Sequence, residues 1–172
     1  PVFLAAFQEF GLPSVIRSDN GVPFSSRSPG GVSTLSAWWI KLGIRPERIE
    51  PAHPEQNGSH ERMHKTLKAE TTKPPQATIG AQQRRFTAFQ NEFNNERPHE
   101  ALGMATPASV YTASPRPYPR RILDPEYDAD QVVRRLSQTG ETQLKGFGIY
   151  CGRTVGRELV AFRQVAERRW EV

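Results

Sequence analysis

Residues 14–21 read Ser-Val-Ile-Arg-Ser-Asp-Asn-Gly, a short apolar run that leads directly into a carboxylate and a turn. The run is too brief for a helix, and its β-branched centre predicts a strand over residues 14–17. Asp19 then stands at the carboxyl end of this strand, which is a common position for catalytic groups in α/β sheets. This stretch therefore predicts an α/β fold with a candidate site at Asp19.

Helices and a second strand are predicted on both sides of this stretch. Before it, Phe3, Leu4, Phe7 and Phe10 recur at helical spacing, and Gly11-Leu12-Pro13 ends that helix. After it, a glycine- and serine-rich loop over residues 25–31 leads to a helix over residues 35–42. A second strand is predicted from residue 43 to Ile49.

Two longer helices follow, separated by prolines. Ser59 is predicted to cap a helix that runs to Lys73 and is stopped by Pro74-Pro75, with Met63 and Leu67 on its buried side. The next helix is predicted over residues 79–95. Its apolar stripe indicates packing against the core and consists of Ile79, Phe86, Phe89 and Phe93.

The composition changes beyond residue 113. Residues 113–121 read Ala-Ser-Pro-Arg-Pro-Tyr-Pro-Arg-Arg, which predicts an extended, semi-rigid linker. From Asp130 onward, short strands are predicted around glycines over residues 132–136, 147–151, 159–165 and 169–172, which is typical of a small barrel or sandwich. We therefore divide the chain into residues 1–113, a linker over 114–129 and an all-β region over 130–172.

The composition also excludes several classes of protein. Cys151 is the single cysteine in 172 residues, which excludes an internal disulfide framework and a multi-cysteine zinc site. No apolar run approaches the roughly 20 residues of a transmembrane helix, so we expect a soluble, cytoplasmic protein. The net charge of +5 suits a nucleic-acid partner but is weak evidence by itself. Because the chain opens on Pro1 in an apparent helix, we expect it to be a fragment.

A second carboxylate stands out in the helix predicted after residue 58. Glu61 lies in the first turn and shares a face with Lys65 and Lys68, at i+4 and i+7. A carboxylate beside a row of lysines would suit a metal ion next to a phosphate backbone. A solvated helix face with an i,i+4 salt bridge explains the same spacing, and the spacing alone favours this second interpretation.

Separated motifs in the first 113 residues resemble the catalytic core of the retroviral-integrase family, and look most like bacterial insertion-sequence transposases with a DDE triad. The motifs are residues 17–24 (Arg-Ser-Asp-Asn-Gly-Val-Pro-Phe), Gly43-Ile44, residues 51–67 (Pro-Ala-His-Pro-Glu-Gln-Asn-Gly-Ser-His-Glu-Arg-Met-His-Lys-Thr-Leu), and residues 93–102 with Thr106-Pro107. The resemblance implies an α/β chain in which a partial ribonuclease-H-like core precedes a small SH3-like β-barrel.

The resemblance implies metal-dependent phosphoryl transfer on DNA, in which strands are nicked and 3′-hydroxyl ends are joined to a target. By motif, Asp19 matches the family's second aspartate and Glu61 its glutamate, which are ligands of two Mg²⁺ (or Mn²⁺) ions. No residue of this chain matches the first aspartate. We therefore expect weak metal binding and no useful turnover by these residues alone.

The resemblance also implies binding of DNA and self-association. The DNA-binding residues that we predict are Gln56, Asn57 and Gly58 in a loop, Lys65 and Lys68 on the following helix, and Arg134 and Arg135 in the all-β region. The intact enzyme would act on transposon ends and target DNA as a homo-oligomer. It would do so in the bacterial cytoplasm, close to the nucleoid, with no membrane partner.

Two other interpretations stay open. A non-catalytic DNA-binding or assembly protein is expected if the missing aspartate reflects a decayed gene, and an aspartate encoded upstream of Pro1 would argue against it. A zinc protease is the remote alternative, because residues 60–64 read His-Glu-Arg-Met-His and match the H-E-x-x-H motif. No strong third zinc ligand is evident, although Glu96 or His99 can be proposed.

Overall fold

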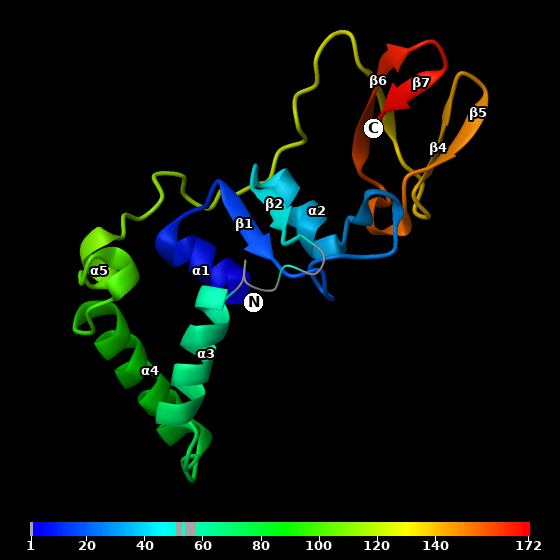
Figure 1. Cartoon of the computed structure of the whole chain (residues 1–172). Coiled ribbons are helices and arrows are strands. Elements are labelled where there is room, and N and C mark those ends of the chain that lie inside the picture. The colour runs from blue at the N-terminus through cyan, green and yellow to red at the C-terminus, as the bar shows by residue number, and fades with distance from the viewer. Residues whose placement is uncertain (1, 51–52, 54–57) are drawn as a thin grey trace. The chain divides into compact units, whose positions relative to one another are not determined.

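The computed structural model describes residues 2–50, 53 and 58–172, with the exception of the Ser59 side chain, and shows a mixed α/β chain (Figure 1). The chain divides into two compact units, the first made of residues 1–49 and 115–172 and the second of residues 50–114. In the described part of the chain, no helix is long and apolar enough to span a membrane.

The first unit begins with two helices and two strands in alternation. They are α1 (Val2–Phe10), β1 (Val15–Ser18), α2 (Thr34–Lys41) and β2 (Arg45–Arg48), with a 3-10 turn over Pro29–Gly31. Gly11 takes a positive φ of 78° directly after α1, which confirms the predicted glycine stop. Strands β1 and β2 pair in parallel, from Val15 opposite Arg45 to Ser18 opposite Arg48. The predicted order helix, strand, helix, strand is confirmed.

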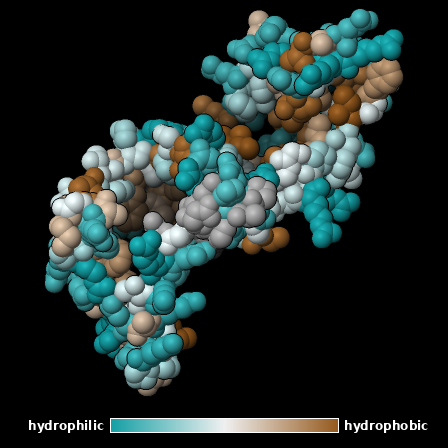
Figure 2. Space-filling view, in the orientation of Figure 1, coloured by the Kyte–Doolittle hydropathy of each residue, from teal (hydrophilic) through white to brown (hydrophobic). Residues whose placement is uncertain are grey.

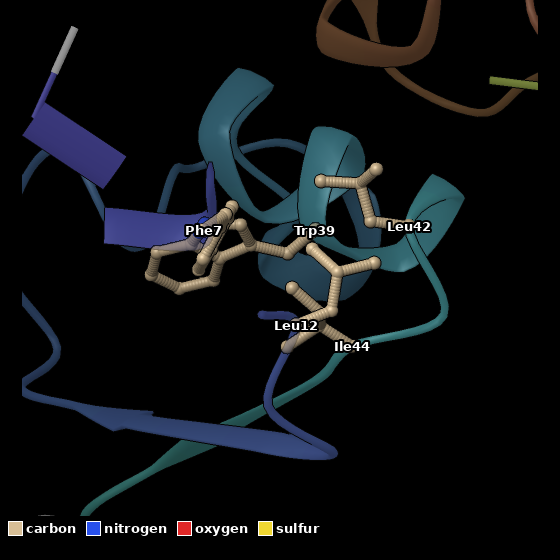
Figure 3. Packing of buried hydrophobic residues seen from close by; sticks show 5 residues of the cluster. All are labelled: Phe7, Leu12, Trp39, Leu42 and Ile44. Atoms are coloured by element: carbon tan, nitrogen blue, oxygen red, sulfur yellow. The ribbon is translucent and has the colours of Figure 1, made fainter. Parts of the chain in front are cut away.

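A small apolar core holds these elements together. Phe7 from α1 and Trp39 from α2 are buried with Leu12, Leu42 and Ile44, the last of which directly precedes β2 (Figure 3). Trp39 has no exposed surface, and its ring lies edge-on to Phe3 at 5.0 Å between ring centroids. Burial of these side chains therefore fixes α1 and α2 against the strand that leads to Asp19.

The second unit is helical. It contains α3 (Gly58–Thr71), α4 (Ile79–Asn95), a 3-10 turn over Glu100–Leu102 and α5 (Pro107–Val110). The predicted bounds of α4 are confirmed, and Thr78 caps it by accepting a hydrogen bond from the backbone N–H of Ala81. Helix α3 begins at Gly58, so the prediction of Ser59 as its cap was wrong, and it ends at Thr71 rather than Lys73.

One residue of the predicted α4 stripe does not pack. Phe89 is buried and Phe93 partly buried, whereas Ile79 is 90% exposed. Ile79 is the first residue of α4. No earlier turn of this helix therefore supplies a side chain that could cover it. The stripe is an apolar face from Phe86 onward.

The all-β region forms two sheets rather than one continuous ladder. Strands β3 (Val132–Arg135), β6 (Leu159–Ala166) and β7 (Arg169–Glu171) make a three-stranded antiparallel sheet. Strands β4 (Glu141–Leu144) and β5 (Phe147–Tyr150) make a separate hairpin, and a 3-10 turn covers Arg153–Val155. Phe162, Leu136 and Leu144 are buried. Short strands around glycines are confirmed, and closure into a barrel stays a prediction.

The proline-rich segment contains no helix or strand and is anchored through Arg116. Its guanidinium donates to the carbonyl oxygen of Leu42 at 2.6 Å and to that of Gly43 at 3.1 Å, at the end of α2. The backbone N–H of Leu12 donates to the Arg116 carbonyl oxygen at 2.7 Å. Further along, Lys41 and Glu158 form an ion pair at 2.9 Å. These contacts explain why residues 115–172 group with 1–49, while the domain boundaries at 113 and 129 stay a prediction.

Candidate functional site

Asp19 directly follows β1, as the sequence predicts, and its carboxylate is exposed. Its Oδ1 atom accepts a hydrogen bond from the backbone N–H of Gly21 at 2.8 Å. Within the described part of the chain, no ion pair or hydrogen bond involves its other carboxylate oxygen, Oδ2. The side chain is therefore fixed by one oxygen and presents the second to solvent.

The turn that carries Asp19 is held by several hydrogen bonds. The Asn20 side-chain amide donates to the carbonyl oxygen of Ile49 at 3.0 Å, which ties the turn after β1 to the residue after β2. The Gly21 carbonyl oxygen accepts from the backbone N–H groups of Phe24 and Ser25 at 2.9 and 3.1 Å. A Cβ atom at Gly21 would lie 3.1 Å from Asp19 Oδ1, so glycine suits this close approach. The position of Asp19 is thus set by the backbone before any ligand binds.

Glu61 lies in the first turn of α3, in the second unit, with an exposed side chain. Lys65 and Lys68 are also exposed on this helix. No ion pair joins Glu61 to either lysine within the described residues, so the i,i+4 salt bridge that the spacing allows is not formed. The charge of each group is available to a ligand, and the N-terminal end of a helix favours a carboxylate at this position.

The other predicted DNA-binding residues lie in both units. Gln56 and Asn57 lie outside the described residues, and Gly58 is the first residue of α3. Arg134 is exposed on β3 and donates to the carbonyl oxygen of its neighbour Val133. Arg135 donates to the Arg157 carbonyl oxygen and lies 3.7 Å from the Asp124 carboxylate, so part of its charge is neutralised. Arg134 is the better placed of the two arginines for a phosphate.

The histidines of the H-E-x-x-H stretch face each other. The Nε2 atoms of His60 and His64 are 3.0 Å apart on the exposed side of α3. Among the described residues, no group of three or more histidine, cysteine, aspartate or glutamate side chains is arranged to hold a metal ion. His99 contacts the Phe93 carbonyl oxygen at 3.3 Å, as expected of a loop hydrogen-bonding residue.

Sequence reasoning missed the role of Arg97. Its guanidinium forms two hydrogen bonds of 2.9 Å with the Glu70 carboxylate on α3 and one of 2.6 Å with Glu92 on α4. It also lies over the rings of Phe89 and Phe93, at 5.7 and 5.9 Å from their centroids. The hydrogen bonds between Arg97 and Glu70 lower the pKa of Glu70 and raise the pKa of Arg97. Arg97 therefore holds α3, the helix that carries Glu61, against α4. In the sequence, Arg97 was marked only by its place in the Arg97-Pro98-His99 motif, which did not indicate these partners.

The sequence is similar to proteins encoded by mobile elements. Residues 42–107 match the family described as integrase core domain. The uncharacterized 39.2 kDa protein of insertion element IS476 from Xanthomonas euvesicatoria is 33% identical over 99 residues, which are 57% of this chain and 27% of that protein. The uncharacterized 31.7 kDa protein of insertion element IS407 from Burkholderia multivorans is 28% identical over 99 residues, covering 57% of this chain and 34% of that protein.

Similarity extends to retroviral proteins. The Gag-Pol polyprotein of baboon endogenous virus is 39% identical over 67 residues, or 39% of this chain and 4% of the polyprotein. A chain in the simian T-cell lymphotropic virus intasome in complex with PP2A regulatory subunit B56 gamma aligns with 98% of this chain and 58% of its own length. The TM-score is 0.47 and the sequence identity 19%. The present chain spans about a third or less of the two insertion-element proteins.

Proposed function

Because this chain carries an integrase core domain of the insertion-element type, we propose that it is part of a transposase that nicks DNA and joins 3′-hydroxyl ends to a target by metal-dependent phosphoryl transfer. The observation that carries the proposal is the Asp19 carboxylate. It lies at the end of a strand in a turn fixed by hydrogen bonds, with one oxygen free among the described residues. Glu61, in the matched stretch, supplies the second carboxylate.

The donor chemistry of these two residues fits a hard divalent cation. Carboxylate oxygens are the ligands preferred by Mg²⁺ and Mn²⁺, and both side chains are exposed. When bound, a pair of such ions would act as a Lewis acid on the scissile phosphate. The Gly21 N–H holds Asp19 Oδ1 and leaves Oδ2 for coordination, so Asp19 requires no rearrangement to act as a ligand.

The cations of the chain would position DNA rather than react with it. Lys65 and Lys68 extend from the same helix as Glu61 and would bind phosphates beside it, since neither is paired with that carboxylate. Gln56 and Asn57, which precede α3 in the sequence, and Gly58, its first residue, would also contact the DNA. Arg134, with Arg135 as a weaker contact, would bind phosphates from β3.

The architecture that we propose follows the resemblance. Residues 1–113 would be part of a ribonuclease-H-like core, 114–129 a linker and 130–172 an SH3-like barrel. The enzyme would act as a homo-oligomer on paired DNA ends, in the bacterial cytoplasm close to the nucleoid. Because only two carboxylates match the family's three, these 172 residues alone would bind metal weakly and have no useful turnover.

The proposal is tested by nicking of supercoiled plasmid DNA that carries the encoding element. The protein is the full-length product of the encoding gene, incubated with Mg²⁺. We expect Glu61→Gln and Asp19→Asn each to slow nicking by at least about 100-fold. Glu126→Gln, an exposed carboxylate in the linker, is the matched control and should nick at the wild-type rate.

Nicking at equal rates by all variants would contradict the assignment of the two carboxylates. Binding of DNA without nicking, together with no aspartate encoded upstream, would favour the non-catalytic interpretation instead. Stoichiometric zinc that is lost on His60→Ala would favour the protease interpretation.

A further inference from the structure

Two β-hairpins of the first unit enclose a groove that the proposed catalytic chemistry does not use. Strands β4 and β5 are joined by the tight turn Lys145-Gly146, in which both residues have positive φ. Strands β6 and β7 are joined by the turn Glu167-Arg168. The groove between the two hairpins has a volume of about 810 Å³. Apolar surface is visible among hydrophilic residues in this part of the molecule (Figure 2).

The walls of the groove are apolar and aromatic. Phe147 and Ile149 lie on one face of β5, and Trp170 comes from β7, opposite Gln164 of β6. Phe147 is 76% exposed. Leaving a phenylalanine in water forgoes roughly 1.5–3 kcal/mol of favourable burial, so an aromatic ring that opens into a groove is a feature of binding surfaces.

The mouth of the groove is cationic. The Lys145 ammonium lies 4.8 Å from the centre of the Trp170 ring, and Arg168 stands in the turn of the other hairpin. Neither cation forms an ion pair within the described residues, whereas Arg163 on the opposite face is paired with Glu171 at 2.9 Å. Glu167 is the one carboxylate among the described residues that line the groove.

An exposed phenylalanine flanked by cations that form no ion pair among the described residues is complementary to unpaired nucleotides. Each base offers a π-face that stacks on an aromatic side chain, and each phosphate attracts a lysine or arginine. A base pair inside a duplex cannot offer that face, because its faces are covered by neighbouring pairs. The groove can therefore distinguish unpaired nucleotides from a duplex by base stacking, whereas the exposed Arg134 can bind the phosphate backbone of either.

We propose that the groove between the β4–β5 and β6–β7 hairpins binds single-stranded DNA, with a base stacked on Phe147 and the flanking phosphates bound by Lys145 and Arg168. The choice of DNA as the polyanion rests on the proposed function. The stacking itself is independent of Asp19 and Glu61.

The test is the binding of a fluorescein-labelled oligothymidylate of about 12 nucleotides to the full chain, followed by fluorescence anisotropy. Stacking of one base changes affinity by roughly 5- to 150-fold on alanine substitution, so Phe147→Ala should weaken binding by about tenfold. The exposure of Phe147 makes unfolding of this variant unexpected, and circular dichroism checks it. Tyr150→Ala is the matched control, because Tyr150 is also an exposed aromatic residue on β5 but lies on the other face. It should change affinity less than twofold.

The cations and the carboxylate are tested by the dependence of affinity on salt. Lys145→Asn and Arg168→Asn should each reduce the slope of log K against log salt by about 0.7, because each removes one phosphate contact. Asparagine tolerates the positive φ of both positions. Glu167→Gln should strengthen binding about twofold, since it removes a negative charge from the lining of the groove.

The outcomes separate this inference from the proposed catalytic function. Phe147→Ala should weaken oligothymidylate binding by the same factor in the Asp19→Asn background as in the unaltered chain, even if Asp19→Asn abolishes nicking. Equal binding of a 12-base-pair duplex, with no effect of Phe147→Ala on either DNA, would overturn the inference. Concentration-dependent dimerisation that is lost in Phe147→Ala, without any effect on DNA binding, would also overturn it, because the groove would then belong to a second copy of the chain.

Discussion

Replacement of Trp39 tests whether the small core of the first unit holds the strand that leads to Asp19. The ring has no exposed surface, lies 5.0 Å from Phe3 and stacks on Phe24 at 5.9 Å. Truncation of a buried tryptophan to alanine costs about 3–5 kcal/mol, and the loss of two ring partners favours the upper part of this range. Domains of this size are stable by about 5–15 kcal/mol, so Trp39→Ala removes a large share of the total.

Urea unfolding of the full chain, followed by circular dichroism, measures this loss. With a dependence of about 2 kcal/mol per molar urea, a loss of about 4 kcal/mol lowers the unfolding midpoint by about 2 M. Ile40→Ala is the matched control on the same helix, because Ile40 is 52% exposed, and it should change stability by less than about 0.5 kcal/mol.

Trp39→Phe makes the prediction sharper. Among the described residues, the indole Nε1 of Trp39 has no hydrogen-bond partner, and a buried polar group without a partner costs about 1–3 kcal/mol. Phenylalanine removes that group, which offsets the loss of volume, so we expect a net cost below about 1.5 kcal/mol. A phenylalanine variant as unstable as the alanine variant would refute the reasoning.

Three further predictions concern the rest of the fold. Gly140→Ala should destabilise the chain by at least about 1–3 kcal/mol, because Gly140 has a φ of 85° and a Cβ atom there would overlap a backbone carbonyl group; Gly148→Ala, where the space is open, should be neutral in the same urea assay. Arg97 lowers the pKa of Glu70 in the folded chain below its ordinary 4.5, so the ion pair stabilises the chain above that pH and its contribution is lost as the pH falls. The urea midpoint of Glu70→Gln should therefore decrease less on acidification than that of the unaltered chain. Burial raises the pKa of the Cys151 thiol, so iodoacetamide should alkylate it more slowly at pH 8 in the folded chain than in urea.

The elements of the chain that have strong local signals could be predicted from the sequence. Helix α1 was recognised because phenylalanines recur at helical spacing and Gly11 stops it. Helix α4 was predicted with its bounds because apolar residues, among them Phe86, Phe89 and Phe93, recur on one stripe. Strand β1 followed from two β-branched residues, and Asp19 came directly after it. In each case the signal and the element occupy the same few residues.

Strand β4 and the anchoring arginines could not be predicted in this way. Residues 141–144 read Glu-Thr-Gln-Leu, without an apolar run, and they form a strand because the Lys145-Gly146 turn brings them against β5. Arg97 contacts Glu70 at a separation of 27 residues, and Arg116 contacts Leu42 at a separation of 74. Such partners are brought together only when the chain folds, so they could not be predicted from composition or residue spacing.

The candidate site was predictable only in its parts. Asp19 and Glu61 were recognised from motifs, and the structure adds the turn that fixes one oxygen of Asp19. The spacing of Glu61 and Lys65 suggested a salt bridge that is not found among the described residues. Side-chain rotation on an exposed helix face decides whether such a pair forms, and a pair of this kind contributes little either way.

The most direct test of the central claim is the binding of Mn²⁺ to the chain, measured by electron paramagnetic resonance of the free ion. The assignment of Asp19 and Glu61 as metal ligands predicts weak binding that Asp19→Asn and Glu61→Gln each reduce by at least about tenfold, as expected on removal of a ligand. Glu126→Gln should bind Mn²⁺ as the unaltered chain does. Equal binding by the unaltered chain and all three variants would contradict the proposal that Asp19 and Glu61 are metal ligands.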